Sequence, residues 1–312
     1  EAVRAGTGES PLEVRFRAAL AELLGRKMAV RTTSDPSGAP ALEIDGGRWR
    51  IRPQLDARGT RPDFTCLRPG GRSPIAIFTD GRNFHASRAH NRLSDDADKR
   101  ARLRAAGYRV ISVSVEDLDG PWNPAWLNEA TVAQLKNGSL GAARAGGVTD
   151  QAIDAWRGGP MALLEAMLND DNEDNEDPGT SPTTAALAAL ADSAWGPLIV
   201  GAAGHLPLGQ NASLRYSSAQ GAGADPLWEA LRVLRPEAEL PEPTGADAAG
   251  APAASKHSGS VFAIPYLALT VQLTGASTTG MALVLDDSDE ALGSPEHPEA
   301  WLAWLRLSNV LA

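Results

Sequence analysis

Short β-forming runs broken by Gly and Pro occupy residues 40–79, and this pattern most limits the folds available to the chain. We predict four consecutive strands here, at 40–45, 48–54, 62–67 and 74–79. A charged run over 91–106 places apolar side chains at helical spacing and ends at Gly107, which predicts a helix. Alternating residues over 108–115 predict one more strand.

A further helix is predicted before these strands. Residues 11–27 carry apolar side chains at helical spacing, with Ser10 suited to the N-cap and Pro11 to the first turn. The order of elements is therefore helix, meander, helix and strand. Because a helix that connects two strands of one sheet covers a face of that sheet, the sequence predicts an α/β sandwich with residues 75–78 in a central buried strand.

A length of 312 residues favours about two domains. We expect an N-terminal α/β domain over 1–120, a partly helical connector over 121–168, an acidic linker over 169–182 and a second, mixed α/β module over 183–312. The linker is rich in Asp, Glu and Asn and cannot bury enough apolar surface to fold. Within the last module we predict helices at 183–194, 226–235 and 297–311, and strands at 197–203, 213–218, 260–273 and 280–286.

The net charge of -10 averages two unlike parts of the chain. Basic residues outnumber acidic ones up to residue 118, and acidic residues dominate afterwards. A basic region indicates a nucleic-acid partner, although an ordinary solvated surface also carries such charge. One cysteine and no run near the roughly 20 apolar residues of a membrane span lead us to expect a cytoplasmic protein without a membrane partner. Gly201-Ala-Ala-Gly204 lacks the rest of a P-loop, so we expect no nucleotide cofactor.

The candidate chemistry lies in Pro62-Asp63-Phe64 and in the run from Ile75 to His85. Asp63 begins one predicted strand and Asp80 ends the next, so a hairpin would bring the two carboxylates together. Carboxylate oxygens are ligands that Mg²⁺ prefers, and in phosphodiester hydrolysis the metal neutralises phosphate charge and lowers the pKa of water. His85 is suited to proton transfer, because imidazole titrates near neutral pH.

Motifs in one order across residues 10–118 carry a resemblance: Pro-Asp-Phe, Phe-Thr-Asp-Gly, Phe-His, a charged helix with Asp95 and Asp96, and Gly-Tyr-Arg-Val-Ile-Ser-Val from residue 107. This region resembles the very-short-patch-repair (Vsr) mismatch endonucleases of the restriction-endonuclease-like PD-(D/E)XK superfamily. The resemblance implies a restriction-endonuclease-like sandwich and an endonuclease that cuts DNA with Mg²⁺ or Mn²⁺. It also implies that Asp63 ligates the metal, that Thr79 lends it a backbone carbonyl and that His85 supports proton transfer.

The sequence also departs from that family. The Vsr enzymes have a second His where Asp80 stands, and the wider superfamily usually has a Lys on this strand, which has none here. We therefore expect Asp80 to be a second metal ligand. The ligands of the structural zinc and the aromatic wedge for a T·G mismatch have no counterpart, so mismatch specificity is not implied. By analogy with similar domains, and because the chain starts at Glu1 without Met, we expect a part of a larger protein, with a helicase or another anti-phage defence subunit as partner.

Each candidate residue also has a purely structural interpretation. Asp63 and Asp80 suit turns as well as metal ligation, and His85 suits a helix cap or the core. Glu13 and Asp96 are expected either beside the active site or on solvated helix faces. Six side chains are expected to contact nucleic acid at the rim of the site, unless they only form surface pairs along a helix: Gln54, Arg82, Arg88, Arg92, Lys99 and Arg100. The alternative function is an inactive module that binds nucleic acid or docks a protein.

Overall fold

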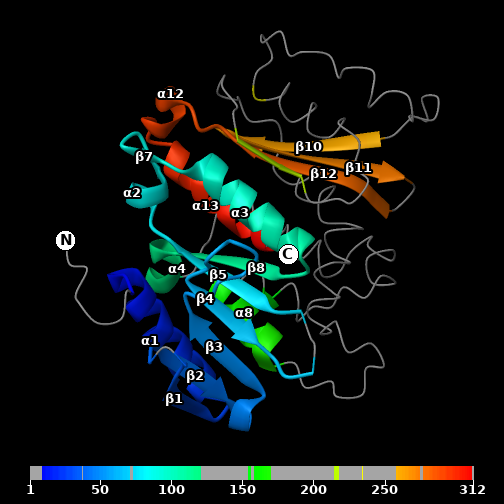
Figure 1. The fold of residues 1–312 in the computed structure, drawn as a ribbon. Helices are drawn as coiled ribbons and strands as arrows, with labels where there is room; N and C mark the ends of the chain where they lie inside the picture. The colour runs from blue at the N-terminus through cyan, green and yellow to red at the C-terminus, as the bar shows by residue number, and fades with distance from the viewer. Residues whose placement is uncertain are drawn as a thin grey trace.

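Six strands form one mixed sheet with helices on both of its faces in the computed structural model of the chain (Figure 1). The structure describes residues 9–36, 38–70, 73–120, 154–155, 158–169, 214–217, 234, 258–274 and 277–310. The strand order is β1-β2-β3-β4-β5-β8, and every adjacent pair is antiparallel except β5 and β8, which are parallel. The strands are β1 (Val30–Ser34), β2 (Pro40–Ile44), β3 (Trp49–Pro53), β4 (Phe64–Leu67), β5 (Ile75–Asp80) and β8 (Arg109–Ser114).

The α/β class and the strands β2 to β5 and β8 confirm the prediction from Gly and Pro breaks and β-forming runs. A short 3-10 turn, η1 (Asp45–Gly47), occupies the break between β2 and β3, where Gly46 adopts a φ of 65°. The sequence analysis missed β1. This strand is short, mostly polar and lies at the edge of the sheet with three of its five side chains exposed, so it lacks the alternation that marks a half-buried strand.

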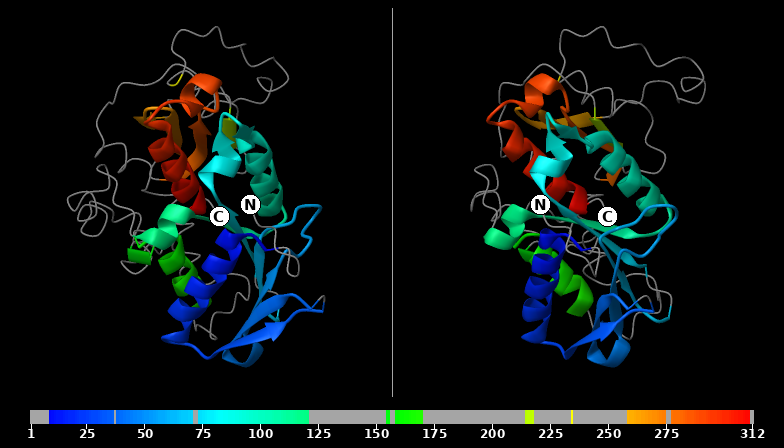
Figure 2. Two further views of the ribbon diagram at one scale, coloured as in Figure 1. Left: turned by 90° about the vertical axis from the view of Figure 1, so that its left-hand side faces the viewer. Right: turned by 60° about the vertical axis from the view of Figure 1, so that its left-hand side comes forward.

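The helix α1 (Pro11–Gly25) covers one face of the sheet. Ser10 caps it by accepting a hydrogen bond from the Glu13 amide, as its sequence predicts. Its apolar stripe packs into the core, and the ring of Phe16 lies 5.1 Å from the ring of Phe64 on β4. The helices α4 (Val115–Asp119) and α8 (Pro160–Asn169) lie on the same side, next to α1 (Figure 2).

The helix α3 (Leu93–Ala105) covers the opposite face. The chain reaches it from β5 through α2 (Arg82–His85), β6 (Ala86–Ser87) and β7 (His90–Asn91), and then returns to β8. Side chains alternate along β5, so Ile77 and Thr79 face α1 whereas Phe78 and Asp80 face α3. The end of β5 therefore presents one polar side chain to each face of the sheet.

A second, antiparallel sheet lies in the C-terminal part, in the order β10-β11-β12-β9. Its strands are β10 (Ser258–Ile264), β11 (Leu267–Thr274), β12 (Ser277–Leu285) and β9 (Leu214–Ser217). The prediction of one strand over 260–273 is wrong, because the chain turns at Pro265 and Tyr266, where Tyr266 has a φ of 68°. Pro265 suits the first central position of such a turn and is the signal that the sequence analysis did not use, whereas Tyr rarely adopts the conformation of Tyr266.

The last helix, α13 (His297–Val310), packs along the outer strand β8, after the short helix α12 (Asp289–Leu292). The Ser112 amide donates to Asn309 Oδ1 at 2.7 Å, and Asn309 Nδ2 donates to the Ser112 carbonyl at 3.0 Å. One side-chain amide thus satisfies the two backbone groups that a neighbouring strand would otherwise pair. Trp301 and Leu305 of α13 belong to the same core as Phe16, so the described C-terminal residues complete the core of the N-terminal region.

Several predictions fall almost entirely outside the described residues. These are most of the connector over 121–168, the acidic linker over 169–182, the helices at 183–194 and 226–235 and the strand at 197–203. Among the helices that the structure describes, none is long and apolar enough to cross a membrane.

Replacing Asn309 with Ala should lower the free energy of unfolding by about 1–3 kcal/mol, because it leaves the buried backbone groups of Ser112 without partners. Urea denaturation of the full chain measures this change. Asn91→Ala is the matched control, since the exposed Asn91 side chain also makes two backbone hydrogen bonds, donating to the Asp287 carbonyl and accepting from the Leu93 amide. Equal, small losses in both variants would show that the Asn309 amide does not protect the strand.

Candidate active site

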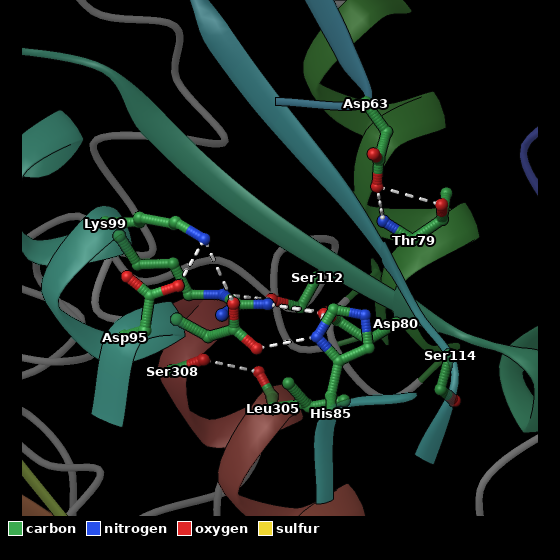
Figure 3. Close-up of polar contacts among 12 residues, drawn as sticks. Asp63, Thr79, Asp80, His85, Asp95, Lys99, Ser112, Ser114, Leu305 and Ser308 are labelled. Carbon is green, nitrogen blue, oxygen red and sulfur yellow. Dashed lines mark hydrogen bonds and ion pairs between the residues drawn. The ribbon is translucent and has the colours of Figure 1, made fainter. Parts of the chain in front are cut away.

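Two groups of polar side chains meet at the end of β5, one on each face of the sheet (Figure 3). The Asp63 cluster consists of Glu13, Gln54, Asp63 and Thr79. The Asp80 cluster consists of Asp80, His85, Asp96, Arg100 and Ser112. Because Thr79 and Asp80 are adjacent in one strand, the two clusters are neighbours but face opposite sides.

In the Asp63 cluster, both hydrogen-bond donors of Thr79 hold one oxygen of Asp63. The Thr79 amide donates to Asp63 Oδ2 at 2.6 Å, and Thr79 Oγ1 donates to the same oxygen at 2.9 Å (Figure 3). Gln54 Nε2 donates to Asp63 Oδ1 at 3.4 Å and to Glu13 Oε2 at 3.3 Å. The Gln54 amide therefore joins two carboxylates that would otherwise repel each other.

Gln54 and Glu13 reach this position from different elements. Gln54 follows β3 with a φ of 49°, a left-handed conformation that is uncommon outside Gly and that occurs often at functional sites. Glu13 lies in the first turn of α1 and is only 7% exposed, so the interpretation of Glu13 as a solvated helix residue is wrong. The structure brings both residues to Asp63. Glu13 was expected beside the site, whereas Gln54 was expected to contact nucleic acid and here donates to two carboxylates.

Burial above all, and the negative charge of Glu13 to a smaller extent, raise the pKa of Asp63 to about 7, against the hydrogen bonds from Thr79, which lower it. A nearby positive charge would stabilise the ionised form of this carboxyl. The available donors fit Mg²⁺ or Mn²⁺, because Asp63 Oδ1 and Glu13 Oε2 are carboxylate oxygens and a turn of the Gln54 amide would present its carbonyl oxygen. Asp63, Glu13 and Gln54 are thus the residues that could hold a divalent cation.

In the Asp80 cluster, a positive charge is already present. Arg100 Nη2 donates to both oxygens of Asp80 at 2.7 Å, and Arg100 Nε donates to Ser112 Oγ at 3.1 Å. Asp80 and Arg100 are each 2% exposed. The sequence analysis expected Asp63 and Asp80 to share one cation. In the structure Asp63 bonds to Thr79 on one face of the sheet, whereas Asp80 is engaged by the Arg100 guanidinium on the other face.

The prediction that Arg100 contacts nucleic acid at the rim is wrong for the same reason. Its side chain points into the core, between α3 and β8, and is not accessible to a phosphate. Helical spacing alone placed Arg100 on the charged face of α3 with Asp96 and Arg104. The burial that removes Arg100 from this face depends on its partners Asp80 and Ser112, which lie on other elements.

His85 lies between two carboxylates of the Asp80 cluster. Its Nδ1 donates to Asp96 Oδ2 at 2.6 Å and lies 3.9 Å from Asp80 Oδ1 (Figure 3). Ligand atoms of Asp80, His85 and Asp96 lie within 4.8 Å of one another. Although burial lowers the pKa of His85, the hydrogen bond to Asp96 and the charge of Asp80 outweigh it, so the pKa is raised above its ordinary value. The solvated-face interpretation of Asp96 is wrong, since Asp96 is buried.

The remaining basic side chains predicted to contact nucleic acid differ in their exposure and in their partners. Arg92 is exposed. Lys99 is half-buried and pairs with Asp95 at 2.5 Å and with Asp96 at 3.8 Å. The guanidinium groups of Arg82 and Arg88 donate to backbone carbonyls of Leu292 and Asp289, at 3.4 Å and 2.7 Å, so they also join the N-terminal region to α12.

Sequence reasoning missed other residues around the site. Phe84, next to His85, is 67% exposed and its ring stacks on that of His90 with a centroid distance of 6.3 Å. Trp304 and Ser112 contact Arg100 from the other side. A Phe-His pair in the motif was visible in the sequence, but no local pattern links Trp304 to a helix about 200 residues earlier in the chain.

Comparison with known proteins found no match: no family model, no curated protein and no solved structure is similar to this chain.

Asp63→Asn removes a buried charge and keeps an oxygen that accepts from Thr79. The folded-state pKa of Asp63 lies above its ordinary value of 3.8, so ionisation of this carboxyl costs the parent chain stability as pH rises from about 4 to about 7. We therefore expect Asp63→Asn to resemble the parent near pH 4 and to exceed its free energy of unfolding by up to about 4 kcal/mol at about pH 8. Urea denaturation at the two pH values measures the difference.

The same variant tests the cation site. At about pH 8, Mg²⁺ should raise the melting temperature of the parent and of Asp56→Asn, an exposed matched control, but not that of Asp63→Asn. An equal response of all three chains would show that Asp63 does not hold the cation.

Proposed function

We propose that the chain is a Mg²⁺-dependent DNA endonuclease of the Vsr-like, restriction-endonuclease-like class. One observation carries this proposal: the end of β5 has a set of carboxylate and amide groups suited to a divalent cation on one face and a His–Asp pair on the other. Hydrolysis of a phosphodiester needs both functions, since charge on the phosphate must be neutralised and a proton must reach the leaving oxygen. The order of the motifs around these residues supports the same conclusion.

Residues of the Asp63 cluster would hold the cation. When bound there, Mg²⁺ neutralises phosphate charge and lowers the pKa of an attacking water. Thr79 fixes the Asp63 carboxylate through two hydrogen bonds to Oδ2, so the other oxygen, Oδ1, keeps one orientation toward Glu13 and Gln54. This fixed geometry avoids the cost of ordering the carboxylate when ligand binds.

His85 would supply the proton. Its Nδ1–H is committed to Asp96, which leaves Nε2 as the nitrogen that exchanges a proton with the substrate. Asp96 and Asp80 stabilise the protonated ring, so the pKa of His85 lies above its ordinary value. We therefore assign His85 as the general acid that protonates the leaving oxygen, with Asp96 orienting its ring.

Exposed groups beside His85 support a nucleic-acid substrate. Arg92 is exposed and suits a phosphate contact, which attracts a backbone without reading its sequence. The exposed ring of Phe84 offers a flat face on which a base can stack. Both groups lie on the crossover between β5 and α3, within eight residues of His85 in the sequence.

The direct test is cleavage of supercoiled plasmid DNA with Mg²⁺ or Mn²⁺. We expect the parent to nick the plasmid and Asp63→Ala to abolish nicking while retaining the circular dichroism spectrum of the parent. Asp96→Asn should lower kcat by roughly tenfold to a thousandfold, because it removes the group that orients the general acid. Asp95→Asn is the matched control on the same helix, since Asp95 is exposed and, among the described residues, forms an ion pair with Lys99 and none with His85. Equal rates in the Asp95 and Asp96 variants would contradict the assigned roles.

The pH dependence of cleavage tests the role of His85. As pH rises through the raised pKa of His85, the general acid loses its proton, so the rate should fall on the alkaline side. The hydrogen bond to Asp96 raises this pKa, so Asp96→Asn should move the alkaline decline to lower pH. A profile in the Asp96 variant that declines at the same pH as the parent would exclude His85 as the proton donor.

One observation favours a second candidate, an inactive module that binds nucleic acid. The strand β5 lacks the Lys that the superfamily usually carries there, and Asp80 is already paired with Arg100. Such a module would bind DNA with an affinity that falls with salt but would not cut it with any divalent metal. Filter binding at several salt concentrations beside the plasmid assay distinguishes the two functions.

A further inference from the structure

The C-terminal helix α13 contacts the Asp80 cluster at two points. The guanidinium carbon of Arg100 lies 5.7 Å from the centre of the Trp304 ring and 4.7 Å from that of Phe78. Asn309, just over one turn after Trp304, binds both backbone groups of Ser112, whose hydroxyl accepts from Arg100 Nε. Two residues of α13 therefore act on the two supports of Arg100, its aromatic environment and its Ser112 partner.

These supports limit the conformations of a long side chain. Arg has several rotatable bonds, so an ion pair in which one guanidinium nitrogen donates to both carboxylate oxygens keeps its geometry only where the guanidinium is held. Ser112 accepts from Nε, the rings of Phe78 and Trp304 both lie near the guanidinium, and Nη2 donates to both oxygens of Asp80. The position of the Asp80 carboxylate, 3.9 Å from His85 Nδ1, is thus determined through Arg100.

The position of Arg100 relative to the surrounding carboxylates affects the electrostatic field at His85. The negative charges of Asp80 and Asp96, and more weakly that of Asp63, raise the pKa of Arg100, and Asp80 and Asp96 also act on His85. Lys99 lies on the other side of Asp96, at 3.8 Å. A small movement of Arg100 would therefore change which carboxylate it neutralises, and with it the field at His85.

We propose that α13 is part of the catalytic unit and that Arg100 is a positioning residue: Trp304 and Asn309 hold Arg100 and Ser112, and Arg100 holds Asp80 beside His85. As a statement about catalysis, this rests on the proposed nuclease function. It also predicts that the region before residue 120 does not form a complete active site without the C-terminal helix, although the motifs all lie in that region.

The test compares Trp304→Leu with Trp301→Leu in the full chain. Both Trp residues are 1% exposed on α13, and among the described residues only Trp304 of the two has a ring contact with Arg100. The two variants should lose thermal stability to a similar extent, because each removes a buried indole. Only Trp304→Leu should lower kcat, by roughly tenfold to a hundredfold, with KM for DNA within about twofold of the parent.

Conservative variants separate positioning from folding. Trp304→Phe keeps an aromatic face for the guanidinium and should restore most of kcat. Arg100→Lys keeps the charge, but all its donors lie on one nitrogen, whereas Arg100 bonds to Ser112 through Nε and to Asp80 through Nη2, so it should not restore activity. Arg102→Lys, an exposed position on the same helix, is its control. Equal losses of kcat in the Trp301 and Trp304 variants, or full activity of Arg100→Lys, would overturn the proposal.

A readout that needs no activity keeps this inference separate from the proposed function. The imidazole NMR signals of His85, assigned by comparison with His85→Gln, should shift in Trp304→Leu but not in Trp301→Leu, because only the first moves Asp80 relative to the ring. If the parent does not cut DNA but this selective shift occurs, the nuclease proposal fails and the positioning of Asp80 by α13 stands. If the His85 signals are the same in both variants, the positioning role is contradicted whether or not the parent cuts DNA.

Discussion

The buried ion pair between Arg100 and Asp80 is the interaction on which the arrangement of the site depends. Removing two charges from water costs several kcal/mol for each ion, and their attraction offsets this cost only where geometry and further hydrogen bonds are good. Here both carboxylate oxygens accept from the guanidinium, and Ser112 satisfies Nε. Loss of either partner would leave an unpaired buried charge, so β5, α3 and β8 are compatible with one relative placement only.

The strand β5 carries the candidate cation site on one face of the sheet and the candidate proton-transfer pair on the other. Thr79 and Asp80 are neighbours in sequence, but the two-residue period of a strand directs them to opposite sides of the sheet. As a result, the guanidinium that neutralises Asp80 does not bond to Asp63, whose raised pKa marks a place where positive charge is lacking. A candidate cation site and a candidate proton-transfer pair can therefore be attached to consecutive residues of β5 without the Arg100 charge neutralising Asp63.

Much of the fold followed from local patterns. Helical spacing predicted α1 and α3, and Gly and Pro breaks predicted β2 to β5, because these signals depend on residues a few positions apart. The sequence analysis missed the edge strand β1, whose side chains are mostly polar and exposed, and the turn at Pro265 and Tyr266, although Pro is a common turn residue. Within the candidate site, motif order identified Asp63, Thr79, His85 and Asp96. It misplaced Arg100, because a helical wheel cannot show that one charged residue points inward.

The sequence by itself determined the candidate reactive groups and the strands and helices that carry them, because alternation, capping and turn chemistry act over short distances. Only the tertiary structure decided how these groups are paired: Asp63 with Thr79 and Gln54, Asp80 with Arg100, and His85 with Asp96. It also decided that a helix near residue 300 supports a strand near residue 110, through Asn309 and Ser112. Partner choice among charged groups depends on burial, and burial is a property of the packed chain as a whole.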